Sequence, residues 1–465
     1  MLKILHYLPG LPPVQNGGMI RYAVDLLTQE AAAGWEVLLL LPGRLPKNRN
    51  KETKIRKAES KGRIRVYEIF HPQPLPMGSG ILHTDEYTKP CRGKPYQVFF
   101  KQERVDVIHL HTLMGLHREF LEEAKRQGIP VVYTTHDYFG LCPLGSLFDA
   151  GSMCVDRKWE HCAQCCKNAY PLWKLRLVHT KAYRRYRRCL WLVRLVHKAA
   201  ERTAFISTRI TVRKPQSVVF SDYGALKAYY TDMLGLVTMF HFNSDTAKEI
   251  YQSRLGAVNG RVIPVTHNGI RDRRRKRRCT GRLRLGYFGN WSEQKGFDAL
   301  LEACGQLYRK GRQDFELHLY SDTKRREECF VKNHLVFNWR GFVQALNNID
   351  VLVVPSLWAE TFGMVVLEAL SCGVPCIVSR NVGAKGLLER FPKTGFVYDG
   401  TVSGLAWTLS SVYDCRELLE QANDAILKMD YDFSYTKHLR SIKELYRKLP
   451  KQRARKLTDR RQPCG

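Results

Sequence analysis

Short apolar strands alternate with amphipathic helices along the chain, and this alternation limits its fold more than any other feature. The first unit predicts a strand at Lys3–Tyr7, a loop rich in proline and glycine, and a helix whose apolar positions recur every three or four residues. Glu36–Leu41 follows as a nearly continuous apolar strand, which is typical of a parallel sheet buried on both faces. The order strand, helix, strand predicts a doubly wound α/β sheet.

The same order returns at 105–135 and in a second series beyond residue 280. That series predicts helices at Phe297–Lys310 and Thr361–Leu370, and strands at Leu283–Phe288, Phe315–Tyr320, Val336–Trp339, Val351–Pro355 and Pro375–Ser379. We expect an N-terminal domain at 1–265, with an insertion at 142–235 that departs from the alternation, and a C-terminal domain at 280–428. A helix at 429–450 and a basic tail at 451–465 follow.

The net charge of +31 is concentrated in a few stretches. Basic residues gather at 44–65, 167–214, 271–284 and 447–461, and the rest of the chain is close to neutral. We interpret these runs as a sign of anionic partners rather than of fold. A nucleic-acid-binding protein is one alternative, but the chain has no basic–aromatic RNA motif and no helix-turn-helix pattern, so we expect no nucleic acid.

The sequence predicts no transmembrane helix, because it contains no run of about 20 apolar residues. The N-terminus is too short and too soon broken by proline to predict a signal peptide. The 14 cysteines are therefore expected to be reduced thiols in a cytoplasmic protein. One cluster has a pair at metal-ligand spacing and allows a second interpretation, a structural zinc site, with Cys142, Cys154, Cys162 and Cys165 as ligands.

The most specific segment runs from Glu360 to Pro375, after a strongly apolar strand. A helix is expected to start near Gly363, and if both Glu360 and Glu368 lay on it, their carboxylates would be about 12 Å apart. Carboxylates accept hydrogen bonds from paired sugar hydroxyls, and free amides at a helix start attract anions. The alternative is two solvated glutamates beside an amphipathic helix.

The pattern E-x-F-G-x-x-x-L-E in this segment resembles the retaining glycosyltransferases of family 4. The resemblance implies the GT-B fold, α/β with two doubly wound Rossmann-like domains facing across a cleft, and a last helix that crosses back to the first domain. Further segments resemble the family in the same order, namely Gly17-Gly18, 106–111, 135–138, Asn243-Ser244, 267–270, 289–296, 394–397 and 433–446.

The resemblance also implies roles for individual residues. Glu368 would bind the ribose of a nucleotide-sugar, Glu360 the donor sugar, and Lys295 the diphosphate. His136 would lie at the reaction centre. The remaining donor-binding positions would be Gly17, Gly18, Asn290, Phe362, Gly363 and Met364. Asn290 stands where the family usually has an arginine, so one positively charged side chain that would pair with the donor phosphates is missing.

These roles predict a retaining, metal-independent glycosyltransferase that moves a sugar from a nucleotide-sugar to a lipid-linked or polysaccharide acceptor, in surface polysaccharide or glycolipid synthesis. Retention would come from front-face attack by the acceptor hydroxyl, and no cofactor is required. A weakly active glycosyltransferase-like subunit is an alternative suggested by Asn290, and a sugar epimerase of the same fold is another.

A basic helical pattern spans 172–202 and includes Trp173 and Trp191. Aromatic and basic residues together suit an anionic bilayer, so we expect a peripheral protein on the inner membrane face. The alternative is a solvated face of a packed helix. His109 and His111 alternate on a predicted buried strand, which favours packing and backbone hydrogen bonds over catalysis. Asp430 and Asp432 are interpreted as a helix start rather than as a metal motif.

Overall fold

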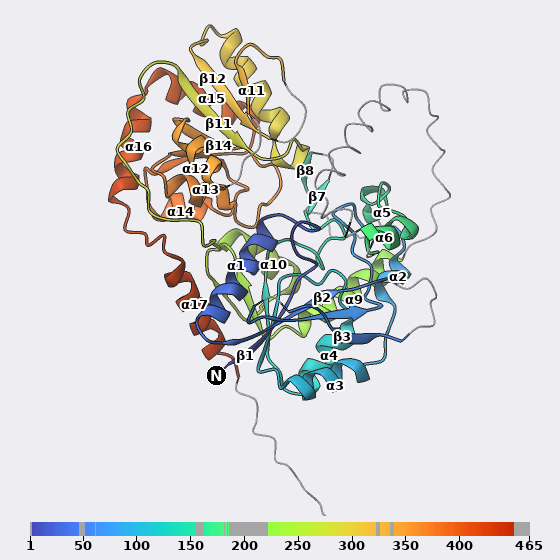
Figure 1. Cartoon of the computed structure of the whole chain (residues 1–465). Helices are drawn as coiled ribbons and strands as arrows, with labels where there is room; N and C mark the ends of the chain where they lie inside the picture. The colour runs from blue at the N-terminus through green and yellow to red at the C-terminus, as the bar shows by residue number, and fades with distance from the viewer. Residues whose placement is uncertain are drawn as a thin grey trace, which may run out of the picture.

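The computed structural model describes residues 2–45, 52–60, 62–149, 151–154, 161–180, 182–183, 185, 222–321, 326–334 and 339–450. These residues form two α/β domains, each with a sheet between helices (Figure 1). Among them, every helix is too short or too polar to span a bilayer.

The N-terminal sheet has eight strands in the order β10-β9-β6-β5-β1-β2-β4-β3. All neighbours are parallel except β3 and β4. The strands are β1 (Lys3–Tyr7), β2 (Glu36–Pro42), β3 (Lys54–Lys57), β4 (Arg65–Phe70), β5 (Val107–Leu110), β6 (Val131–Thr134), β9 (Met239–Phe242) and β10 (Gly260–Val262). The helices are α1 (Gly18–Ala32), α2 (Thr84–Thr88), α3 (Lys94–Glu103), α4 (Arg118–Arg126), α9 (Tyr223–Gly235) and α10 (Asp245–Leu255).

The C-terminal sheet has six parallel strands in the order β13-β12-β11-β14-β15-β16. The strands are β11 (Leu283–Phe288), β12 (Phe315–Tyr320), β13 (Val331–His334), β14 (Val351–Val354), β15 (Cys376–Ser379) and β16 (Gly395–Tyr398). The helices are α11 (Phe297–Arg309), α12 (Trp339–Asn347), α13 (Met364–Leu370), α14 (Lys385–Arg390), α15 (Val402–Asp414) and α16 (Glu417–Lys428). The predicted doubly wound fold is confirmed, because each sheet reverses its strand order in the middle.

The last helix, α17 (Tyr435–Arg447), follows the C-terminal domain but packs against α1 of the N-terminal domain (Figure 1). Tyr446 shares a hydrogen bond with Glu30, and His438 Nε2 lies 3.0 Å from the hydroxyl of Tyr22. Both contacts are buried. Residues of α17 therefore complete the packing of the N-terminal domain around α1.

Two parts of the sheets differ from the prediction. β13 spans Val331–His334, which the prediction did not include, and the strand expected at Val336–Trp339 lies outside the described residues except for Trp339, which begins α12. β13 is an edge strand with exposed residues at Lys332 and Asn333, so it lacks the apolar run that marks the inner strands. The sequence analysis also missed β3 and β4. β3 is an edge strand with a single apolar residue, Ile55, whereas β4 lies inside the sheet and is largely buried.

The insertion after residue 142 is described in part. It contains a hairpin of β7 (Phe148–Asp149) and β8 (Ser152–Met153) and two short helices, α5 (Cys162–Cys165) and α6 (Leu172–Val178). The basic helix predicted at 172–202 is interrupted, because α6 ends at Val178 with His179 as its C-cap, and residues 181, 184 and 186–202 lie outside the described residues.

The basic run at 271–284 has a structural role that the charge pattern did not indicate. Arg274 donates to the carbonyl oxygens of Ile426 and Met429, at 2.8 and 2.7 Å, and Arg277 donates to that of Asn347 at 3.1 Å. Burial lowers the pKa of Arg277. Guanidinium groups thus satisfy carbonyls at helix ends and fix the linker to the C-terminal domain, so the interpretation of this run as a partner site was wrong for these side chains.

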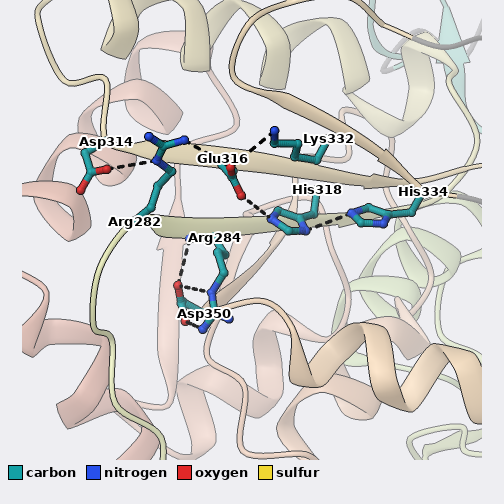
Figure 2. Close-up of polar contacts among 8 residues, drawn as sticks. All are labelled: Arg282, Arg284, Asp314, Glu316, His318, Lys332, His334 and Asp350. Atoms are coloured by element: carbon teal, nitrogen blue, oxygen red, sulfur yellow. Dashed lines mark hydrogen bonds and ion pairs between the residues drawn. The ribbon is translucent and has the colours of Figure 1, made fainter.

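Ion pairs connect neighbouring strands of the C-terminal sheet (Figure 2). Glu316 on β12 contacts Arg282, Lys332 and His318. Arg284 on β11 donates through Nε and Nη2 to the two carboxylate oxygens of Asp350, at 3.1 and 2.6 Å, and the side chain of Asp350 is only 4% exposed. The same carboxylate accepts the backbone N–H of Arg284 at 2.9 Å, so it joins β11 to the start of β14.

We predict that Asp350→Ala lowers the free energy of unfolding by about 2 kcal/mol, because the guanidinium and amide of Arg284 lose their acceptor. Urea denaturation measures this loss. Asp414→Ala is the matched control: Asp414 makes the same two-point contact with Arg312, at 2.8 and 2.7 Å, but is 52% exposed, so little change is expected. Equal losses in the two variants would contradict the importance given to burial.

Candidate active site

The C-terminal sheet places two loops at its reversal point, after β11 and after β14. Ligands of doubly wound sheets bind outside the carboxyl ends of the strands at this point. Lys295 lies in the first loop and Glu360 in the second, and Lys295 Nζ is 2.7 Å from Glu360 Oε1. Ser356 donates to the other carboxylate oxygen at 2.7 Å. The two predicted residues thus meet at the point where a ligand is expected.

Glycine at 296 fixes the position of Lys295. Gly296 has a φ of 67°, and a Cβ at this residue would overlap the carbonyl oxygen of Pro355 in the second loop. The backbone of the first loop therefore lies directly against the second. Trp358, in the same second loop, lies with its ring 5.4 Å from Lys295 Nζ.

Glu360 is not part of the following helix, contrary to the assumption behind the 12 Å estimate. It forms an isolated bridge with Val382, and α13 begins at Met364 with Gly363 as its N-cap. The backbone N–H of Glu360 donates to Asn381 O at 2.9 Å. The predicted helix of 361–370 is therefore shorter, because residues 360–363 pair with the chain after β15 instead.

Glu368 lies on α13 and contacts residues from outside its own domain core. His267 Nε2 is 2.7 Å from Glu368 Oε1, and Arg21 of α1 is 3.6 Å from the same oxygen. The predicted glycine loop is next to this helix: Gly17 is the N-cap of α1 with a φ of 124°, and a Cβ on Gly18 would lie 3.0 Å from Met364 Cε. Asn290 is exposed, with its carbonyl accepting from Tyr287 at 2.8 Å.

Thr361 joins the donor side of the site to the N-terminal domain. Its hydroxyl donates to the carbonyl oxygen of His136 at 3.0 Å, and its own carbonyl accepts from the hydroxyl of Ser244 at 2.6 Å. His136 therefore lies across the domain boundary from Glu360 and Phe362, the neighbours of Thr361. Burial and the nearby His241 lower the pKa of His136 to about 3, so its ring is neutral near pH 7.

A cluster of buried histidines behind His136 was missed by sequence reasoning. The register of β1 and β5 pairs His6 with His109, and these two rings lie with His111 close enough for three ligand atoms to be within 4.8 Å of one another. Such a group could hold a metal, but every ring nitrogen already has a side-chain partner. His109, for example, lies 2.6 Å from the hydroxyl of Tyr446 and 2.7 Å from that of Thr134.

The H-x-H pattern at 109–111 was the available signal. It was interpreted as packing with backbone hydrogen bonds, whereas the partners are side chains. Because β1 and β5 are neighbours at the reversal point of the N-terminal sheet, a histidine on β1 could have been added to the pattern.

Two sequence profiles match this chain over separate ranges. Residues 16–211 match the family described as Glycosyltransferase Family 4, and residues 282–414 match Glycosyl transferases group 1. The chain belongs to the group 1 glycosyltransferases. Its family resemblance is thereby confirmed, and the C-terminal match includes both Lys295 and Glu360.

Two curated relatives of this glycosyltransferase match it over short ranges. The UDP-Gal:alpha-D-GlcNAc-diphosphoundecaprenol alpha-1,3-galactosyltransferase of Escherichia coli is 32% identical over 117 residues, 25% of this chain and 30% of that protein. A D-inositol 3-phosphate glycosyltransferase of Arthrobacter is 27% identical over 150 residues, 29% of this chain and 35% of that protein. The matches thus span about a third of these relatives' length.

Solved structures match the glycosyltransferase over nearly its whole length. Sucrose-phosphate synthase from Thermosynechococcus elongatus has a TM-score of 0.56 and 15% identity, covering 96% of this chain and 98% of that one. Anabaena HepE, solved in complex with UDP-glucose, has a TM-score of 0.52 and 15% identity, covering 97% and 100%. At these identities the likeness establishes the GT-B fold alone.

The cysteines of the glycosyltransferase's insertion are free thiols. Among the described residues, no three of Cys142, Cys154, Cys162 and Cys165 bring their sulfurs within 4.8 Å of one another. Burial and, to a smaller extent, a hydrogen bond to Asp149 raise the pKa of Cys165 to about 12, so this residue is a thiol near pH 7. Zinc binding by this cluster stays a prediction.

We predict that Gly296→Ala strongly destabilises the glycosyltransferase and displaces Lys295, because Ala must take a positive φ and its Cβ would overlap the chain at Pro355. Thermal unfolding measures the loss. Gly311→Ala is the control, since Gly311 has a φ of 83° but open space around its Cβ position. The loss at 296 should exceed that at 311 by at least about 2 kcal/mol. Similar losses would show that backbone strain alone decides the cost.

Proposed function

We propose that this glycosyltransferase transfers a sugar from a nucleoside-diphosphate sugar to an acceptor hydroxyl, with retention at the anomeric carbon and without a divalent metal. The observation that carries the proposal is the 2.7 Å pair of Lys295 and Glu360 at the reversal point of the C-terminal sheet. Thr361 links this pair to His136 across the domain boundary. A charged lysine and a polyol-binding carboxylate therefore face the boundary together.

The donor would lie against the two loops of the C-terminal domain. Lys295 would neutralise the diphosphate and stabilise the charge of the leaving group. Glu360 would accept hydrogen bonds from sugar hydroxyls, and Glu368 those of the ribose, after its contact with Arg21 opens. A structure of the same fold, Anabaena HepE, is known with UDP-glucose, which supports a nucleotide-sugar as the donor class.

The acceptor would enter from the N-terminal domain. A cavity of about 110 Å³ lies beside the loop after β1, which is one of the two loops at the reversal point of that sheet. Its lining includes Pro9 and Gln15 from this loop, Pro42 at the end of β2, and Val178 and His179 at the end of α6. The acceptor cavity thus touches the same short helix that begins the basic stretch.

That helix also presents an apolar pair to solvent. Trp173 and Leu177, one turn apart on α6, are 66% and 53% exposed, and Lys174 and Arg176 lie between them. Aromatic and basic residues side by side suit the surface of an anionic bilayer. The relative from Escherichia coli is named for a diphosphoundecaprenol-linked acceptor, which supports a lipid-linked acceptor brought to the cavity by membrane docking.

We predict that Lys295→Ala and Glu368→Ala each lower kcat/KM for the donor at least tenfold, about 1.4 kcal/mol, because each removes a contact to the diphosphate or ribose. A screen of UDP-, GDP-, ADP- and dTDP-sugars identifies the donor, and the assay is run with EDTA present. Lys310→Ala and Glu389→Ala, two exposed positions of the same domain, are the controls. Unchanged kinetics in both site variants would refute the site, and activity that requires Mg²⁺ would refute metal independence.

We also predict that the protein sediments with phosphatidylglycerol vesicles at low salt, and less so at high salt because ions screen the attraction. Trp173→Ser with Leu177→Ser should weaken sedimentation. Trp407→Ser is the control, since Trp407 on α15 is similarly exposed, at 72%, but lies in the other domain. A wild-type protein that ignores the vesicles would exclude docking, and equal effects of Trp407 would exclude α6 as the docking surface.

A further inference from the structure

A chain of buried hydrogen bonds connects Glu30 on α1 to His136. Glu30 Oε2 lies 2.6 Å from His6 Nε2, and His6 Nδ1 lies 3.1 Å from His111 Nε2. His111 Nδ1 in turn lies 3.1 Å from His136 Nε2. Glu30, His6 and His111 are fully buried, so each contact must be satisfied within the protein.

The direction of each hydrogen bond follows from the acceptor at one end of this row, the carboxyl group of Glu30. The carboxyl oxygen Oε2 of Glu30 accepts, so His6 carries its proton on Nε2. With one proton on each ring, His6 Nδ1 accepts from Nε2–H of His111. For the same reason His111 Nδ1 accepts from Nε2–H of His136. His136 Nδ1 is then unprotonated, and it makes no hydrogen bond to the described residues.

The rings of His109, His111 and His136 are neutral for a physical reason. Burial, together with the neighbouring imidazoles, lowers the pKa values of His109 and His111 well below the ordinary value, and that of His136 to about 3. An imidazolium in this interior would lose its hydration and face several other rings. Each of these three rings therefore carries a single proton, which fixes the direction of its hydrogen bonds.

The other oxygen of Glu30 starts a second arm that ends at a carbonyl. Glu30 Oε1 shares a hydrogen bond of 3.1 Å with Tyr446, which is followed by His109, Thr134, His241 and the carbonyl oxygen of Ile263. The carbonyl only accepts, so neutral His241 donates to it through Nε2 and accepts the hydroxyl of Thr134 at Nδ1. The hydroxyl of Tyr446 donates to Oε1 and His6 Nε2 to Oε2, so both carboxyl oxygens of Glu30 accept hydrogen bonds.

The whole network thus contains eight hydrogen bonds, and Glu30 lies where its two arms meet.

We propose that Glu30, His6 and His111 are positioning residues that hold His136 in a single tautomer, with its proton on Nε2 and with Nδ1 as an acceptor at the domain boundary. The proposal rests on the role of His136 in the proposed transfer reaction. An unprotonated Nδ1 can accept a hydrogen bond from a hydroxyl of a sugar bound between the domains. The opposite tautomer would present an N–H there and would compete with Lys295 as a donor.

The tautomer can be measured without any substrate. Nitrogen NMR of the full chain labelled with ¹⁵N-histidine distinguishes protonated from unprotonated ring nitrogens, and His136→Gln identifies the signals of His136. We expect Nε2 of His136 to be protonated and Nδ1 unprotonated in the wild-type protein. Protonation on Nδ1, or a mixture of tautomers, would overturn the proposal, and this result needs no variant of Glu30, His6 or His111.

Two substitutions of Glu30 then separate hydrogen bonding from packing. The amide oxygen of Glu30→Gln can still accept from His6, so this variant should keep the tautomer. Glu30→Met has a similar length but makes neither bond, so His136 should become a mixture of tautomers. Thr134→Val is the control, because it cuts the second arm only and should leave His136 unchanged. An unchanged tautomer in Glu30→Met would overturn the proposal.

Activity gives a second readout with the nucleotide-sugar found in the donor screen. We expect Glu30→Met to lower kcat at least tenfold with the donor KM within about twofold, and Glu30→Gln to restore kcat to within about threefold of the wild type. Full kcat in Glu30→Met despite mixed tautomers would overturn the positioning role. If no nucleotide-sugar is used by the wild type but the NMR result is as expected, the proposed function fails while the tautomer assignment holds.

Discussion

The arrangement of the site depends on the contacts that Thr361 makes with the N-terminal domain. Its hydroxyl and its carbonyl are both held by the N-terminal domain, through His136 and Ser244, while its neighbours Glu360 and Phe362 belong to the donor loop. Gly383 lies so close to Thr361 and Ser244 that any Cβ there would overlap both. Two short hydrogen bonds in a space this small fix the distance between the domains where the candidate residues meet, and a side chain larger than glycine at 383 would open it.

Much of the fold follows from the sequence because the inner strands of a parallel sheet must be apolar on both faces. β1, β11 and β14 are buried nearly throughout, and all were predicted within one residue of their ends. Edge strands escape this rule: β3 and β13 pair on one side only, so polar residues are tolerated and the apolar signal is lost. The arginines at 271–284 were misinterpreted because charge counts do not show that a guanidinium can satisfy buried carbonyls.

The residues of the candidate site were predictable to the extent that they belong to local motifs. Lys295 and Glu360 each lie in a loop with a recognisable pattern, and the fold brings those loops together at the reversal of the sheet. The histidine network has no such pattern. It requires neighbouring strands to present His6 and His109 on the same face, and it needs Tyr446 from the opposite end of the chain. Its members become a unit only in three dimensions.

The position of Tyr446 has a consequence for how this protein is made. Glu30 and His109 are both buried in the first domain, yet each depends on a tyrosine that is synthesised 416 and 337 residues later. Domains generally fold from the N-terminus as the chain emerges from the ribosome. Here the first domain would have to wait with buried polar groups unpaired, or partly open, until the second domain has been synthesised and α17 can return to it. The two sheets are separate in space, but the first is completed only by the last helix.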